Sequence, residues 1–572
     1  MARSFTSYMI FDFTFHGVFL LPLLLLVLQF SSQLANCGTI VKYLPGFQGP
    51  LPFLLETGYI GVGENDDVQS FYYFIESENN PKVDPLMLWL TGGPGCSAFS
   101  GLVFEIGPLT FKNEEYNGSL PNLYLKPHSW TKVSNIIFVD LPVFTGFSYA
   151  RTDSAAQRSD CLLVNQTHQF LRKWLIEHPK FLSHEIYIGG DSYSGIPIPA
   201  VVQEISQGNE EGVQPWINLQ GYLLGNPVTT RTEKNYKIPF AHGMALISDE
   251  LYNSLQTNCK GDYINIDTEN VLCSRDIASF NKAIEGLNSA QILDPLCEYI
   301  TSPKPEKFSG RRALTENKYS RSFLAPPLTL PPLSCRSYAY FLCTYWANDD
   351  SVRNALHIRK GSIGEWHRCT WNIPHKLEIY NSFEYHVNLS RKGYRSLIYS
   401  GDHDMTVPFL STQAWIRSLN YSIVEDWRQW QTNGQVAGYT RTYSNMMTFA
   451  TVKGGGHTAP EFKPEECFAM YSRYIGVGEN EDVQAFYYFI ESENNPKVDP
   501  LMLWLTGGPG CSAFSGLVFE IGPLGFRNEE YNGSLPNLIY RPYSWTKTSS
   551  IIFVDLTHML DQNLSQREAI HC

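Results

Sequence analysis

The most informative segment of the sequence is Ile186-Tyr187-Ile188-Gly189-Gly190-Asp191-Ser192-Tyr193-Ser194-Gly195-Ile196. It reads as a buried strand, a sharp turn flanked by glycines and the start of a helix. A serine on such a turn projects at the carboxyl edge of a sheet, where a nucleophile can meet a substrate. Gly190 and Gly195 allow the close backbone approach that the turn demands. Turns of this composition are frequent, so a catalytic role for Ser192 needs support from the rest of the chain.

Two later strand ends supply an acid and a base in the chain order of α/β-hydrolases, which is serine, then acid, then histidine. The strand at 396–399 is followed by Asp402 and Asp404, and a later strand leads through three glycines to His457. The imidazole takes the hydroxyl proton, and a carboxylate fixes its tautomer. The sequence therefore predicts Ser192, Asp404 and His457 as a catalytic triad. Asp402 is the alternative acid, with shaping of the turn as its other possible role.

The rest of the pattern fits this fold class. Short apolar runs alternate with glycine- and proline-rich turns and helical stretches, as at 86–90, 135–139 and 196–205. Such alternation predicts an α/β fold, with a mixed central sheet and helices on both faces. Residues 230–345 are rich in Cys and Pro and poorly periodic. We expect them to form an inserted helical cap over the sheet.

A glycine-rich loop supplies a candidate oxyanion hole. Leu88-Trp89-Leu90-Thr91-Gly92-Gly93-Pro94-Gly95-Cys96 follows the apolar run at 86–90. Consecutive glycines expose backbone N–H groups that can face a developing negative charge. We predict that the amides of Gly93 and Tyr193 act together as the oxyanion donors.

The composition and the N-terminal segment of the chain restrict its binding partners and its cellular compartment. The net charge of −13 argues against binding of nucleic acid, which needs clustered basic residues. Residues 18–29 are apolar but too short to span a bilayer, and they predict a signal peptide over 1–37. We expect a glycoprotein of the secretory pathway, extracellular or vacuolar, with no membrane association after signal removal. The expected glycosylation sites are Asn117, Asn165, Asn388 and Asn420.

An internal repeat sets the domain organisation. Residues 474–556 repeat 59–141 at an offset of 415, with about ten differences, and 557–572 are unrelated to either copy. Structural repeats are usually short, adjacent and divergent, so this one indicates an in-frame duplication or a merged gene. The second copy has an oxyanion-type loop but no serine turn, acid or histidine after it. We predict a partial duplicate without an active site.

Four blocks carry a family resemblance: Trp89-Leu90-Thr91-Gly92-Gly93-Pro94-Gly95-Cys96-Ser97, Gly190-Asp191-Ser192-Tyr193-Ser194-Gly195, Gly401-Asp402-His403-Asp404 and Gly455-Gly456-His457. They resemble the signature blocks of serine carboxypeptidases, and the match covers about 38–473. The resemblance implies that the second aspartate, Asp404, is the catalytic acid. It also implies an acyl-enzyme on Ser192. Family members commonly have Gly at the position of Phe144, where a bulky residue at positive φ would be strained.

The resemblance also implies which residues recognise the substrate. Carboxypeptidases of the family bind a free carboxylate with an Asn and two Glu, and the corresponding residues here are Thr91, Asp191 and Glu105, beside Gly92. Replacement of Asn and one Glu resembles plant carboxypeptidase-like acyltransferases, which use 1-O-glucose esters as acyl donors. We therefore expect transfer from a small glucose ester to an alcohol acceptor. The alternatives are a carboxypeptidase acting on a peptide C-terminus and a non-catalytic glycoprotein.

Cysteine pairing and cofactors complete the expectations. The resemblance implies the disulfides Cys96–Cys335 and Cys259–Cys273, and leaves Cys297 with Cys343 or Cys369 as candidate partners. Spacing alone does not determine connectivity. No metal and no cofactor are expected.

Overall fold

The computed structural model describes residues 38–267, 269–297, 331–476, 487–506, 512–529 and 533–554. The chain divides into two compact units, Met1–Ile475 and Gly476–Cys572. The predicted signal peptide over 1–37, part of the expected cap and the tail 557–572 lie outside the described residues. Within the described residues, no helix has both the length and the apolar character needed to cross a bilayer.

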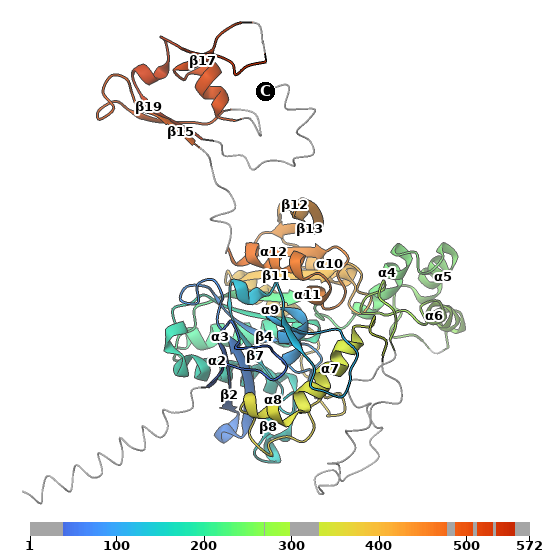
Figure 1. The fold of residues 1–572 in the computed structure, drawn as a ribbon. Coiled ribbons are helices and arrows are strands. Elements are labelled where there is room, and N and C mark those ends of the chain that lie inside the picture. Colours follow the sequence, from blue (N-terminus) through green and yellow to red (C-terminus); the bar gives the residue numbers. More distant parts are fainter. Residues whose placement is uncertain are drawn as a thin grey trace, which may run out of the picture. The chain divides into compact units, whose positions relative to one another are not determined.

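One mixed sheet organises the first unit (Figure 1). Its strands run in the spatial order β1 (Thr39–Val41), β2 (Leu55–Val62), β3 (Val68–Ile75), β7 (Asn135–Val139), β4 (Leu86–Leu90), β9 (Ile186–Asp191), β10 (Leu219–Gly225), β11 (Arg395–Gly401), β14 (Met447–Val452), β13 (Gln435–Tyr443) and β12 (Ile423–Thr432), and β8 (Tyr149–Ala150) pairs with β3. Pairing is parallel from β7 through β4, β9, β10 and β11 to β14, and antiparallel at both ends. This confirms the predicted mixed sheet.

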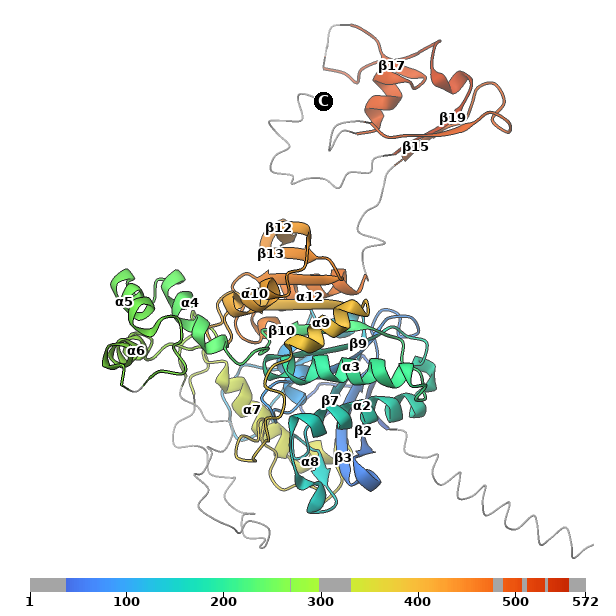
Figure 2. The same cartoon turned by 180° about the vertical axis from the view of Figure 1, so that it is seen from behind.

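Helices cover one face of the sheet side by side (Figure 2). They are α2 (Asp160–Glu177), α3 (Pro197–Glu210) and α9 (Phe383–Arg391). Because side chains alternate along a strand, Leu86, Leu88 and Leu90 of β4 share this face and join the core cluster that contains Phe170 and Trp174 of α2. The strands are apolar on consecutive positions because both faces of the sheet are covered.

The other face of the sheet carries an aromatic stack. Trp89 of β4 meets the edge of Trp130, with ring centroids 5.7 Å apart, and Trp130 stacks on Tyr471 of α12 (Pro464–Ile475) at 4.0 Å. Further helices of this unit are α7 (Ser337–Asn348), α8 (Asp350–Ala355), α10 (Phe409–Ser418) and α11 (Ala459–Phe462). Helices therefore lie on both faces, as the sequence predicts.

A group of three helices lies at one edge of the first unit in both views (Figures 1 and 2). They are α4 (Lys237–Gly243), α5 (Asp249–Cys259) and α6 (Val271–Ala283), and they share a separate apolar cluster. The chain then returns to the sheet, where the amide of Met405 donates to Ser289 O (2.9 Å) and the amide of His457 to Ala290 O (2.7 Å). The insertion between β10 and β11 thus braces the loops that carry the predicted acid and base.

The second unit forms a small sheet of its own. Its strands run β15 (Tyr487–Ile490), β19 (Ser550–Val554) and β16 (Leu501–Trp504), and a hairpin joins β17 (Leu524–Phe526) to β18 (Leu538–Tyr540). These elements correspond to β3, β7 and β4 and to the hairpin of β5 (Leu109–Phe111) and β6 (Leu123–Leu125) in the first unit. The repeated sequence therefore forms the same local structure twice.

Candidate functional site

Ser192 lies on a sharp turn between β9 and α3. Its φ of 55° is in the left-handed region, which non-glycine residues rarely adopt without support from their surroundings. The short 3-10 helix Ser192–Gly195 follows and leads into α3. A methyl group on Gly195 would come within 2.4 Å of Val228 O, so only glycine fits where the turn packs on the chain after β10. The turn therefore has the strained geometry that the sequence predicts for an exposed nucleophile.

The three residues of the predicted triad meet in one hydrogen-bonded line. Ser192 Oγ lies 2.7 Å from His457 Nε2, and His457 Nδ1 lies 2.8 Å from Asp404 Oδ2. They come from the ends of β9, β11 and β14, with β10 between β9 and β11, and these parallel strands bring them to one edge of the sheet. In this arrangement Ser192 can donate its hydroxyl proton to His457, whose Nδ1–H donates to Asp404.

Asp404 is fully buried, and both of its carboxylate oxygens accept hydrogen bonds from the surrounding protein. The amides of Thr406 and Val407 donate to it at 2.7 and 3.2 Å, and Asn226 Nδ2 donates to Oδ2 at 2.8 Å. Asn226 also accepts from the amide of Gly401 (3.1 Å), so it ties the end of β10 to the acid loop. The sequence motif Gly225-Asn226-Pro227 contributed to the resemblance without revealing this role, because the contact spans 178 residues.

Asp402, the alternative acid, shapes the turn. It accepts from the amide of Gly454 at 2.7 Å and contacts His403 Nδ1 at 2.6 Å. The geometry therefore favours Asp404 over Asp402 as the partner of His457.

The charges around His457 favour protonation of its imidazole. Burial lowers the pKa of His457, but the charge and hydrogen bond of Asp404 and the charge of Asp191 raise it, and the net pKa is above the ordinary value. The acid beside it thus stabilises the imidazolium that forms when Ser192 loses its proton.

The glycine loop after β4 lies directly over Ser192. A methyl group on Gly92 would come within 2.7 Å of Ser192 Cβ and 2.8 Å of Asp191 O. Gly93 has a φ of 134°, a backbone conformation that residues with side chains rarely adopt. The structure thus brings the Gly92–Gly93 loop and the amide of Tyr193 to the same side of the nucleophile.

The predicted substrate-binding acids lie close together under this loop. Asp191 Oδ1 accepts from the amide of Gly92 at 2.9 Å, and Glu105 Oε2 accepts from Trp89 Nε1 at 3.1 Å. Burial, together with the charge of Asp191, raises the pKa of Glu105 well above its ordinary value, and burial also raises the pKa of Asp191. The raised pKa favours the neutral form of Glu105, which can donate a hydrogen bond. Thr91 Oγ1 is buried and has no hydrogen-bond partner among the described residues.

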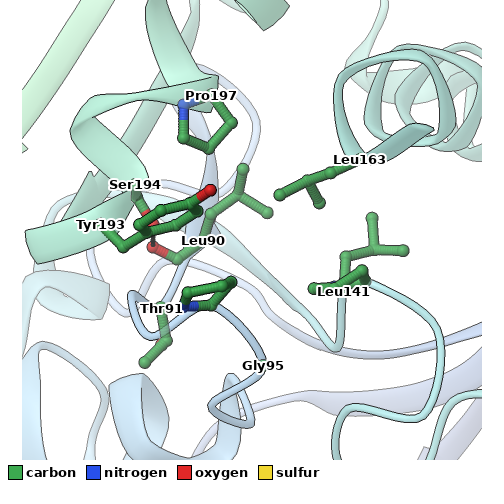
Figure 3. A pocket seen from close by; sticks show the side chains of 10 residues that line it. Leu90, Thr91, Gly95, Leu141, Leu163, Tyr193, Ser194 and Pro197 are labelled. Carbon is green, nitrogen blue, oxygen red and sulfur yellow. Dashed lines mark hydrogen bonds between the residues drawn. The ribbon is translucent and has the colours of Figure 1, made fainter. Parts of the chain in front are cut away.

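A small pocket with both polar and apolar walls lies beside the serine turn (Figure 3). Tyr193 and Leu90 face Leu141 and Leu163 across it, and Thr91 lies on its rim. The described residues contain no group of three or more His, Cys, Asp or Glu side chains placed to hold a metal ion.

One expected disulfide is wrong. The structure joins Cys96 to Cys369, not to Cys335, and Cys335 pairs with Cys297. The reason is local backbone pairing: the amide of Ser97 donates to Arg368 O (2.8 Å) and the amide of Thr370 to Gly95 O (2.9 Å), so the two chains run side by side at Cys96 and Cys369. The partners considered for Cys297 are therefore also wrong: Cys369 is taken by Cys96, and Cys343 is a buried free thiol. The expected Cys259–Cys273 bridge is present and links α5 to α6.

Two further expectations concern single residues. Phe144 has a φ of 63°, so the turn after β7 does hold a bulky residue in the left-handed region. The side chains at the four expected glycosylation sites are exposed, and glycosylation stays a prediction; the sites are Asn117, Asn165, Asn388 and Asn420.

Comparison with known proteins identifies the family. The family model described as serine carboxypeptidase matches residues 45–476 and again 468–557. Serine carboxypeptidase-like 19 of Arabidopsis thaliana is 53% identical over 459 residues, covering 79% of this chain and 97% of that protein. Serine carboxypeptidase-like 2 of the same plant is 56% identical over 455 residues, covering 79% and 96%.

A solved structure shows the fold relationship. The prohormone-processing carboxypeptidase Kex1 of Saccharomyces cerevisiae superposes with a TM-score of 0.56 at 19% identity, covering 77% of this chain and 93% of that one. Together with the family match, the mixed sheet and the serine turn, this similarity places the chain among hydrolase-type serine enzymes. The chain belongs to the serine carboxypeptidase family.

Proposed function

We propose that this enzyme transfers acyl groups from 1-O-glucose esters to an alcohol acceptor through an acyl-enzyme on Ser192. The proposal rests on Thr91 and Asp191, which replace the Asn and the Glu that bind the substrate carboxylate in carboxypeptidases of the family. Asp191 is engaged with the Gly92 amide, and Thr91 offers one hydroxyl where an Asn would offer two N–H donors. A site altered in this way binds a peptide carboxylate less well, while the machinery for acyl transfer is kept.

The chemistry uses the residues described above. Ser192 Oγ attacks the ester carbonyl as His457 Nε2 takes its proton, and the amides of Gly93 and Tyr193 stabilise the oxyanion. Collapse of the tetrahedral intermediate expels glucose, which receives the proton from His457. The acceptor alcohol then gives its proton to His457 as it attacks the acyl-enzyme, and Ser192 is regenerated.

A serine carboxypeptidase is the second candidate, and Glu105 favours it. A neutral carboxyl group at Glu105 can donate to the carboxylate of a peptide C-terminus, as the raised pKa of this residue allows. Hydrolysis would use the same triad, with water in place of the alcohol.

The two candidates are separated by parallel assays of the full-length protein. We expect product formation from glucose esters of phenolic or fatty acids with an alcohol acceptor, and little release of residues from blocked dipeptides. The matched variant combines Thr91→Asn with Asp191→Glu, and it should gain dipeptide hydrolysis at the expense of transfer. Turnover of dipeptides alone by the unaltered protein would overturn the assignment.

We further infer a secretory route and a cap. The apolar segment 18–29 and the three disulfides support passage through an oxidising compartment, towards the extracellular space or the vacuole. The helices α4, α5 and α6, inserted between β10 and β11, support the cap assignment within 230–345. Mass spectrometry of the N-terminus of the expressed protein tests the route, because cleavage should fall near residue 37.

A further inference from the structure

Asp160 is a fully buried carboxylate outside the triad, bound to the residue that follows the nucleophile. It is the first residue of α2, and its Oδ1 accepts a short hydrogen bond from the hydroxyl of Tyr193. The same oxygen lies 2.9 Å from His375 Nε2. The His375 ring also packs edge-on against the Tyr193 ring, with centroids 5.9 Å apart. The Tyr193 side chain is therefore held at both its hydroxyl and its ring.

The other carboxylate oxygen of Asp160, Oδ2, also has several hydrogen-bond donors. Oδ2 accepts from the amides of Glu378 and Ile379 at 2.7 and 2.9 Å, and Arg231 Nη2 lies 3.5 Å away. Burial raises the pKa of Asp160, but these amides and the hydrogen bonds from His375 and Tyr193 lower it, and the net pKa is below the ordinary value. An ionised carboxylate thus fastens the serine turn to α2 and to the segment before α9.

A small rotation of the peptide unit between Ser192 and Tyr193 would turn its N–H group away from the oxyanion. This peptide unit carries the amide assigned to the oxyanion hole, and it follows a serine held at a φ of 55°. A side chain anchored at its far end limits rotation of its own backbone. Displacement of a donor by about 1 Å can cost about 10²-fold in rate.

We propose that Asp160 is a positioning residue, which holds the Tyr193 hydroxyl and so keeps the Tyr193 amide directed at the oxyanion formed on Ser192. The proposal rests on the Ser192 nucleophile of the proposed function but not on the identity of the acyl donor or acceptor. It goes beyond that function because Asp160 touches neither the triad nor the substrate.

The chain offers a matched control at the opposite end of α2. Tyr72 donates to buried Glu56 Oε1 at 2.7 Å, and His178 Nε2 lies 2.8 Å from the same oxygen. This is again a tyrosine, a carboxylate and a histidine, but Tyr72 lies on β3, which two strands separate from β9. Tyr72→Phe and Tyr193→Phe each remove one hydroxyl from a buried carboxylate, so they should cost similar stability.

The test compares the two variants in the full-length protein. We expect Tyr193→Phe to slow fluorophosphonate labelling of Ser192 about tenfold and to weaken a boronic acid that forms a tetrahedral serine adduct by a similar factor. KM for a turned-over ester should stay within twofold, because ground-state binding is unchanged. Asp160→Asn, which keeps one oxygen for the amides, should lie between the unaltered enzyme and Tyr193→Phe. Tyr72→Phe should lower Tm but leave the labelling rate of Ser192 and the affinity for the boronic acid unchanged.

Equal labelling rates for Tyr193→Phe and Tyr72→Phe would overturn the proposal and leave Asp160 with a purely structural role. The labelling rate does not depend on whether glucose esters or peptides are the substrate. An enzyme that acts only on peptides but shows the slowed labelling would therefore contradict the proposed donor and support the positioning role.

Discussion

Residues 59–141 and 474–556 differ at ten positions, and their local structures agree closely. In the first copy Ser77 Oγ lies 2.5 Å from Asp84, and in the second Ser492 Oγ lies 2.6 Å from Asp499. Likewise the ring centroids of Trp89 and Trp130 and those of their counterparts, Trp504 and Trp545, are both 5.7 Å apart. Short-range sequence is therefore sufficient for these turns and contacts.

Burial separates the two copies. Leu88 is 0% exposed and its counterpart Leu503 is 58% exposed; Trp130 is 0% exposed and Trp545 is 49% exposed. The first copy lies between β2, β9, α2 and α12, whereas β15 and β16 are both edge strands of their three-stranded sheet. In the first unit β9, which leads to Ser192, lies beside β4, the strand before the oxyanion loop. Among the described residues of the second unit, no strand takes the place of β9 beside β16. The elements that surround the first copy therefore bury its side chains and complete the active site. Substitutions at equivalent positions of the two copies can measure this difference in burial and activity.

Among the paired substitutions, the glycine loop should give the largest difference between the two copies. Gly92→Ala should reduce the rate of acyl-enzyme formation by about 10²–10³-fold, because the added methyl group collides with Ser192 and the backbone of Asp191. Gly507→Ala at the equivalent position should leave the rate unchanged. Stopped-flow measurement of the acylation burst checks both variants. A loss of rate in the second variant would mean that the duplicate takes part in catalysis.

The next effect concerns stability. Leu88→Ala should lower the free energy of unfolding of the first unit by about 2–5 kcal/mol, because it opens a cavity against α2. Leu503→Ala should change stability by less than about 0.5 kcal/mol, since that side chain is largely exposed. Denaturant unfolding followed by fluorescence measures both. Equal losses would show that the second sheet is covered by another surface in solution.

A smaller effect concerns pH. The folded-state pKa of Glu105 is raised, so its ionisation opposes folding, and stability is lost as pH rises from the unfolded pKa towards the folded one. Glu105→Gln should remove this loss, so the variant gains stability relative to the unaltered protein as pH rises above about 4.5. Glu520→Gln, at the exposed counterpart, should run parallel to the unaltered protein. Thermal unfolding between pH 4 and 8 gives the comparison.

The smallest effect on activity comes from removing the second unit. Truncation after Gly476 should leave kcat/KM within twofold, because every residue assigned to the site lies before that point. It should raise solubility, since the exposed side chains of Tyr487, Leu501 and Leu503 and two open sheet edges are lost. Light scattering during concentration, with activity assays alongside, tests this. A drop in activity would contradict the view of the duplicate as dispensable.

Much of the fold, and the convergence of the three candidate catalytic residues, could be predicted because each signal is local. Ser192, Asp404 and His457 each follow a recognisable strand, and parallel strands bring their carboxyl ends to one edge. The positive φ of Phe144 also followed from its motif. These predictions needed only the order of the elements and not their contacts.

The residues that sequence reasoning missed act across long separations. Asn226 reaches Asp404, and Asp160 reaches Tyr193, through contacts that no local pattern encodes. The pairing of Cys96 failed for the same reason, because it depends on where the chain at Cys369 runs relative to the oxyanion loop. Polar networks and disulfides of this kind depend on tertiary packing.

The central claim is that Ser192, activated by His457 and Asp404, is the nucleophile. A fluorophosphonate probe followed by peptide mapping of the full-length protein tests it most directly. We expect a single modified residue, Ser192, with labelling slowed by about 10⁴-fold or more in His457→Ala. Modification of another residue, or no labelling of folded protein at neutral pH, would contradict it.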